Sequence, residues 1–180
     1  ILNFENIEDV YKFFNKINLN MDLHLIIITE GGHSDGPDTI AYHLSQLKEY
    51  GYIYKINIYI PSYAMSSGTM IMLCGDNIYL DWYSSTSPVD SQLEYQIEYQ
   101  IDENESFSTK YLKEINPLGE YKNNISKMIK LEADAVYRTD KYILKRILKN
   151  NPNKNKIIKN IFDTKLYHGM TFNYIDLKKM

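Results

Sequence analysis

The sequence predicts an α/β fold in which repeated strand–helix–strand units build a mostly parallel sheet. Apolar, β-branched runs alternate with helical patterns through residues 1–81, an order that is typical of helices packed on a parallel sheet. The chain has 180 residues, of which 44% are hydrophobic, so it can bury one sizeable core. We therefore expect a single domain over residues 1–180, with a late helical part from about residue 121.

Local patterns predict the elements of the first half. The pattern at 38–50 is helical and stops at Gly51. The run Ile56-Asn-Ile-Tyr-Ile60 is β-branched and aromatic, is closed by Pro61, and indicates a buried strand. Apolar residues near the N-terminus recur at helical spacing: Val10, Phe13, Phe14 and Ile17. In order, we expect a helix at 7–17, a strand at 23–29, a helix at 38–50, a strand at 54–60, a short helix within 64–74 and a strand at 77–81.

The second half gives weaker signals. Residues 82–92 read as a loop, and 93–120 are polar, with 102–108 expected to be mobile. A long helix is expected at about 121–149, because an Asn-rich break follows it. A short helix at about 157–162 and a tail complete the chain.

A serine turn follows the second predicted strand. Ser66 stands where extended chain becomes helix, and the first turn of a helix has unpaired backbone N–H groups. This placement favours a nucleophile beside an oxyanion site. The structural alternative is a serine that caps a core helix.

A glycine pair follows the first predicted strand. Gly31 and Gly32 would let the backbone approach a ligand closely. Parallel strands joined by a crossover helix bring both turns to the same edge of the sheet. The N–H groups of Gly32 and of the residue after Ser66 could then flank one oxygen atom. The alternative is two ordinary strand–helix loops.

These motifs together resemble the serine dehydrogenase proteinase family, a branch of the Clp protease/crotonase fold close to signal peptide peptidase A. The family motifs are Pro-Gly-Gly, Tyr-Ala-Met-Ser-Gly-Gly-Thr, Gly-Pro-Val-Asp-Pro-Gln and a late Thr-His-Asp-Tyr-Pro. The corresponding segments here are Glu30-Gly-Gly32, Tyr63-Ala-Met-Ser-Ser-Gly-Thr69, Ser87-Pro-Val-Asp-Ser-Gln92 and Tyr167-His-Gly-Met170. The similarity spans nearly the whole chain and is tight from about residue 22 to residue 92.

The resemblance implies a Clp/crotonase-like fold with Ser66 as nucleophile. Gly32 and Ser67 would supply the oxyanion N–H groups, with Ser67 standing where the family has Gly. Glu30 replaces a proline and adds a negative charge near that site. Relatives with this fold form rings or trimers, so the resemblance also implies a homo-oligomer.

The general base is the open part of this hypothesis. Clp proteases use Ser-His-Asp and signal peptide peptidases use Ser-Lys, but the loop at 87–90 holds no histidine and Gly169 aligns with the triad aspartate. His168 and several late lysines stay as alternatives, and a lysine base would need burial to lower its pKa. The lysines are Lys110, Lys113, Lys127 and Lys130.

The leading functional hypothesis is a serine endopeptidase that hydrolyses peptide bonds through an acyl-enzyme at Ser66. One alternative is an inactive scaffold or partner-binding subunit with the same fold. A crotonase-like acyl-CoA enzyme is a further alternative, against which the serine turn argues. We expect no cofactor, and no metal site because the four histidines are scattered.

The composition indicates which classes of binding partner to expect. The net charge of −3 argues against nucleic acid, and we expect a peptide or protein substrate. We see no signal peptide and no run that could span a bilayer. The chain begins at Ile1 rather than Met, so we expect membrane association only through an anchor in a preceding segment, and otherwise a cytoplasmic protein.

Overall fold

The computed structural model describes residues 7–17, 20–32, 35–95, 105–108, 123–162 and 170–179. The chain divides into two compact units: unit 1 contains residues 1–89 and 143–180, and unit 2 contains residues 90–142. The sequence analysis did not predict this division, and the single domain over 1–180 stays a prediction.

A three-stranded parallel sheet forms the centre of unit 1. Its strands are β1 (Leu23–Ile26), β2 (Ile56–Ile60) and β4 (Asn77–Leu80), with β2 in the middle. Leu25 pairs with Ile58, and Ile58 pairs with Ile78. The three strands lie where the apolar runs predicted them, which confirms the strand–helix–strand order.

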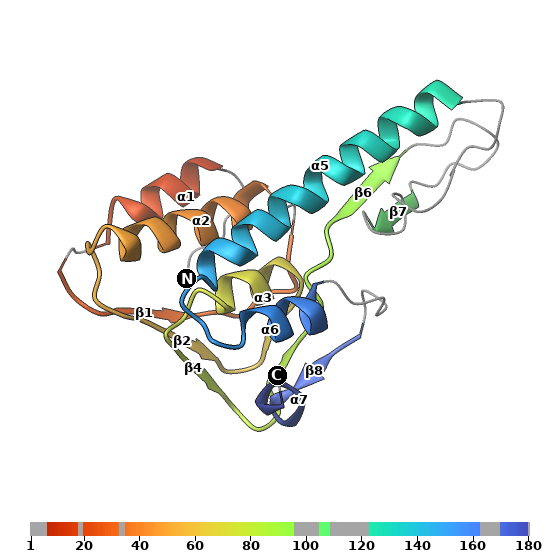
Figure 1. Ribbon diagram of the computed structural model, residues 1–180. Coiled ribbons are helices and arrows are strands. Elements are labelled where there is room, and N and C mark those ends of the chain that lie inside the picture. The colour runs from red at the N-terminus through yellow and green to blue at the C-terminus, as the bar shows by residue number, and fades with distance from the viewer. Residues whose placement is uncertain are drawn as a thin grey trace. The chain divides into compact units, whose positions relative to one another are not determined.

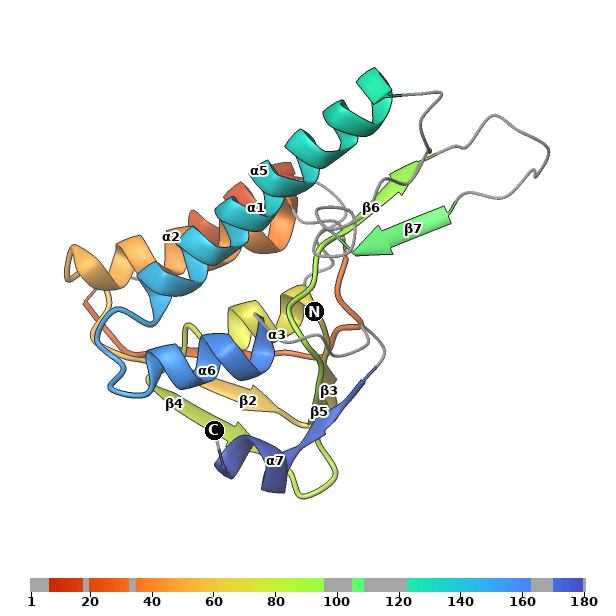
Figure 2. The same ribbon diagram turned by 45° about the vertical axis from the view of Figure 1, so that its right-hand side comes forward.

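Helices cover one face of this sheet. They are α1 (Ile7–Phe14), α2 (Asp35–Glu49), α3 (Ser67–Met72) and α6 (Lys154–Ile161). Figures 1 and 2 show α3 and α6 next to the sheet, with α1 and α2 on the far side of α3. Ile56, Ile58 and Ile60 of β2 are buried among these helices, so alternate residues of the middle strand build the core.

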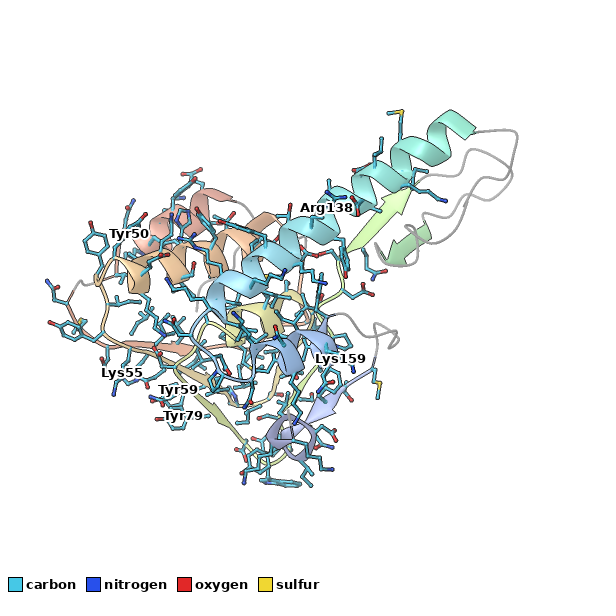
Figure 3. All side chains as sticks on the ribbon, in the orientation of Figure 1. Tyr50, Lys55, Tyr59, Tyr79, Arg138 and Lys159 are labelled. Atoms are coloured by element: carbon cyan, nitrogen blue, oxygen red, sulfur yellow. The ribbon has the colours of Figure 1, made fainter. Side chains whose placement is uncertain are left out.

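The opposite face of the sheet carries aromatic rings. Tyr59 and Tyr79 are register partners and stack with their ring centroids 4.7 Å apart. Figure 3 shows both side chains pointing away from the helices, and Tyr79 is 49% exposed. The Nδ1 atom of His24 lies 3.1 Å from the Tyr59 hydroxyl, so this histidine belongs to the outer face.

A second small sheet lies beside α3. Strand β3 (Tyr63–Ala64) runs parallel to β5 (Ser85–Thr86), and β5 pairs antiparallel with β8 (Phe172–Asn173). The helix α7 (Tyr174–Lys178) follows, with Asn173 and Asp176 forming a capping box. The sequence predicted a loop at 82–92 and an irregular tail, so β5 and β8 were missed.

Unit 2 holds an antiparallel strand pair and most of a long helix. The strands are β6 (Gln92–Tyr95) and β7 (Glu105–Ser108). Residues 105–108 are therefore a strand, whereas the sequence suggested a mobile segment. The helix α5 (Asn123–Ile147) confirms the predicted long helix, and its last residues, from 143 onward, belong to unit 1.

Ion pairs bind the end of α5 to α2 within unit 1. The Arg146 guanidinium lies 2.6 Å from the Glu49 carboxylate, and Lys149 lies 3.0 Å from it. The hydrogen bond with Lys149 is the main cause that lowers the pKa of Glu49. Among the described helices, none is both long enough and apolar enough to cross a membrane.

Candidate active site

Ser66 lies in a strained turn between β3 and α3. Its backbone angles are φ 50° and ψ −115°. Residues other than glycine adopt this backbone conformation only at a cost in free energy. Its side chain does not cap α3 and makes no hydrogen bond to the part of the chain that the structure describes. Ser66 is half-buried, and within the described residues its hydroxyl serves no structural hydrogen bond.

The chain reaches this turn alongside the extension of β1. Thr29 forms a parallel bridge with Ala64. The Thr29 N–H donates to the Tyr63 carbonyl at 3.1 Å, and the Met65 N–H donates to the Thr29 carbonyl at 2.9 Å. These bonds bring the segment after β1 next to the residue before Ser66.

The glycine turn contacts Ser66 at this point. Gly31 has φ +107°, and a Cβ atom built on it would lie 3.0 Å from Ser66 Cβ and 3.3 Å from the Met65 carbonyl oxygen. Only glycine fits both the backbone conformation and the space. The structure therefore brings the Gly31–Gly32 turn and Ser66 together. Gly32 itself is exposed and open, with nothing within 4 Å of an added Cβ.

Two backbone N–H groups at this turn make no hydrogen bond to the described residues. They belong to Gly32 and Ser67, the two residues that sequence reasoning assigned to an oxyanion site. The Ser67 side chain is also unusual, because Ser67 is 7% exposed and its buried Oγ has no partner among the described residues. A buried polar atom without a partner needs an explanation, such as an ordered water or a ligand.

Ser87 and Thr69 support the turn from the other side, and sequence reasoning missed both. The Ser87 Oγ accepts a hydrogen bond from the Ser66 N–H at 2.6 Å. The Thr69 Oγ1 lies 2.8 Å from the Ala64 carbonyl oxygen and 2.9 Å from that of Ser87. The only sequence signal was the serine before Pro88, because no local pattern reveals the β3–β5 pairing that joins the two segments.

The structure does not identify a general base. His168, Lys110 and Lys113 lie outside the described residues, as does the side chain of Lys127. Lys130 is half-buried on α5 in unit 2, while Ser66 belongs to unit 1.

The described histidines lie away from Ser66. His24 is on the outer face of the sheet, and His43 packs against the Phe14 ring at a centroid distance of 5.1 Å. His43 is half-buried on α2.

Cys74 is not a second nucleophile. It is buried after α3, with its Sγ 3.7 Å from the carbonyl oxygens of Ala41 and Met70. Burial raises the pKa of the Cys74 thiol to about 12, so the reactive thiolate is scarce at neutral pH. Within the described residues, no group of three or more His, Cys, Asp and Glu side chains could hold a metal ion.

Comparison with known proteins identifies relatives over most of the chain. The family model described as ClpP-like SDH-type serine proteinase matches residues 1–174. The uncharacterized protein MJ1495 of Methanocaldococcus jannaschii is 36% identical over 96 residues, which are 52% of this chain and 31% of that protein. The chain thus spans about a third of the length of this relative.

Solved structures confirm the predicted Clp-type fold. A ClpP1 point mutant from Listeria monocytogenes gives a TM-score of 0.54 at 16% identity, covering 99% of this chain and 81% of that chain. ClpP1 from the same organism gives a TM-score of 0.51 at 15% identity, with the same coverage. At this level of identity the likeness concerns the fold.

Proposed function

Because the chain belongs to the family of ClpP-like SDH-type serine proteinases, we propose that it is a serine endopeptidase with Ser66 as nucleophile. The observation that carries the proposal is the strained backbone of Ser66, with φ 50°, together with a hydroxyl that makes no hydrogen bond to the described residues. Such strain persists only when the surroundings hold it, and it gathers at functional sites. A serine that only capped the helix would need neither the strained backbone nor a hydroxyl without a hydrogen bond.

The proposed reaction passes through an acyl-enzyme. Ser66 Oγ attacks the peptide carbonyl carbon while a base takes its proton, and the N–H groups of Gly32 and Ser67 donate to the developing oxyanion. The carbon–nitrogen bond then breaks, and the departing amine receives the proton. Water attacks the ester with the same base and restores Ser66. His168 or one of the late lysines is the proposed base.

The proposed substrate is an extended peptide. An added strand would bind through main-chain hydrogen bonds, as extended peptides do at exposed strand edges. Gly32 is exposed at the end of the β1 extension, so the backbone there is accessible to such a peptide.

A fluorophosphonate probe tests the proposal. We expect the probe to form one covalent adduct, located by mass spectrometry on the peptide that contains Ser66. Ser66→Ala should lose the adduct, whereas Ser67→Ala should keep it, because the proposed contribution of Ser67 is its backbone N–H. Absence of an adduct on the folded protein would favour the alternative, an inactive scaffold with the same fold.

A further inference from the structure

The Ser66 backbone needs support that its own element does not provide. A residue with φ 50° and ψ −115° has a strained backbone that its surroundings must hold in place. Its carbonyl accepts the Thr69 N–H at 2.9 Å, so the helix holds one side of Ser66. The N–H side faces away from that bond and requires a separate partner.

Ser87 provides this partner from another strand. Its hydroxyl accepts the Ser66 N–H at 2.6 Å, and no other side chain among the described residues bonds to the Ser66 backbone. Ser87 follows β5 and is 4% exposed, so water does not readily replace its hydroxyl. Loss of the hydroxyl would leave a polar N–H group without its bond.

Ser87 is itself held in place by α3. The Thr69 Oγ1 lies 2.9 Å from the Ser87 carbonyl oxygen and accepts the Ser87 N–H at 3.3 Å. Thr69 is fully buried on α3 and stands three residues after Ser66. Hydrogen bonds therefore link Ser66 to Ser87, Ser87 to Thr69, and Thr69 back to Ser66, and they hold both ends of the turn.

The backbone N–H groups of Ser66 and Ser67 have different roles in this arrangement. The Ser66 N–H is used by Ser87, while the Ser67 N–H makes no hydrogen bond to the described residues. Rotation of the peptide group between Met65 and Ser66 would turn the Ser66 N–H away from Ser87 and change the φ angle of Ser66. The Ser87 bond opposes this rotation.

We propose that Ser87 is a positioning residue for Ser66, whose hydroxyl keeps the serine turn in its reactive conformation. Ser87 neither donates nor takes the proton of the reaction. The inference rests on the proposed role of Ser66 as nucleophile.

The test compares two buried serines. Ser84 is fully buried, and its Oγ accepts the Asp81 N–H at 2.9 Å and donates to the Ile60 carbonyl. Ser87→Ala and Ser84→Ala each remove one buried hydroxyl that serves a backbone N–H, so their losses of stability should be similar. Only Ser87 contacts the Ser66 turn, which makes Ser84→Ala the matched control.

The first measurement is the rate of fluorophosphonate labelling against probe concentration. Ser87→Ala should lower the maximal rate by about 10- to 100-fold through misplacement of the hydroxyl, with little change in the half-saturating concentration. Ser84→Ala should label like the unmodified chain. Unchanged labelling of Ser87→Ala, or an equal loss in Ser84→Ala, would overturn the proposal.

The second measurement separates this proposal from the proposed function. Hydrogen exchange of the Ser66 amide, followed by NMR, should be about tenfold faster in Ser87→Ala and unchanged in Ser84→Ala. If the unmodified chain is not labelled, the proposed function fails, and the exchange rate alone then decides whether Ser87 holds the turn. Equal exchange in both variants overturns the positioning role.

Discussion

Ser66 combines a strained backbone with a hydroxyl that makes no bond to the described chain, and these two features have separate consequences. Replacement by alanine keeps the strain and removes only the hydroxyl. Replacement by glycine removes the strain as well, since glycine adopts positive φ readily. The structural alternative considered from the sequence, a serine that caps a helix, would imply a loss of about 1 kcal/mol for alanine. No such cap exists here, so the loss should be smaller.

The first prediction follows from this difference. Ser66→Gly should be more stable than Ser66→Ala by about 1 kcal/mol, because it relieves the left-handed conformation. Both variants should lose fluorophosphonate labelling. Urea unfolding of the two variants measures the difference. An alanine variant as stable as the glycine variant would show that the turn is not strained.

The second prediction concerns Cys74. Burial raises the pKa of its thiol from 9.0 to about 12, so above pH 9 the unfolded chain loses a proton that the folded chain keeps. The contribution of the protonated Cys74 thiol to the free energy of unfolding is fully present below pH 9. It declines as the pH rises from 9 toward 12. The free energy of unfolding should fall by about 1.4 kcal/mol per pH unit in that window because of this group.

Cys74→Ala lacks this titration, so comparison with it isolates the contribution of the thiol from those of all other groups. Unfolding by urea should show a constant gap between the unmodified chain and Cys74→Ala up to about pH 8. The gap should narrow by about 1.4 kcal/mol by pH 10. A gap that stays constant would contradict a buried, neutral thiol.

At the scale of single residues, the sequence located the serine turn and the glycine turn because both consist of small residues at strand ends. It did not distinguish Gly31, which contacts Ser66, from Gly32, which is open. The sequence analysis missed Ser87, because the role of this residue depends on a hydrogen bond to Ser66, 21 residues earlier in the chain. Hydrogen bonds between distant segments leave no local pattern.

At the scale of elements, α3 approaches the extension of β1 through a glycine. A Cβ on Gly68 would lie 2.4 Å from Thr29 Cγ2, a distance that requires movement. Alanine is otherwise the better helix former. The contact therefore explains why this buried helix position holds glycine.

The third prediction tests this contact with two substitutions. Gly68→Ala should lower the free energy of unfolding by about 1–3 kcal/mol through overpacking. Thr29→Ser removes Cγ2 but keeps the Oγ1 that accepts the Gly31 N–H at 3.1 Å. In the double variant most of the Gly68→Ala loss should disappear. Additive losses in this double-mutant cycle would place the strain elsewhere.

The predictable elements are those with long periodic or apolar runs. The strands β1, β2 and β4 and the helix α5 follow such runs and lie close to their expected bounds. Strands β5 and β8 have two residues each, and their pairing joins 85–86 to 172–173. A two-residue strand has no alternation to read, so this sheet could not be foreseen.

At the scale of the whole molecule, the sequence indicated the family but not the division into units. Residues 90–142 interrupt the chain of unit 1, and the polar stretch at 93–120 covers only part of this insertion. The same limit applies to the base, because the lysines proposed for it all follow residue 90. Their distance from Ser66 depends on tertiary structure that no local pattern encodes.

The fourth prediction is that the protein forms a homo-oligomer, as the family resemblance implies. Met128 and Leu131 are 69% and 63% exposed on α5, and Tyr142 lies on the same face of the helix. Large exposed apolar side chains grouped on one face are typical of interfaces. Light scattering at high micromolar concentration should show a multiple of the 21.2 kDa chain mass.

Replacing Met128 and Leu131 together by lysine should shift the mass toward the monomer, whereas Ile175→Lys, an exposed control on α7, should not. A monomeric unmodified chain would contradict the prediction, and an oligomer sensitive only to Ile175→Lys would show that α5 is not its interface.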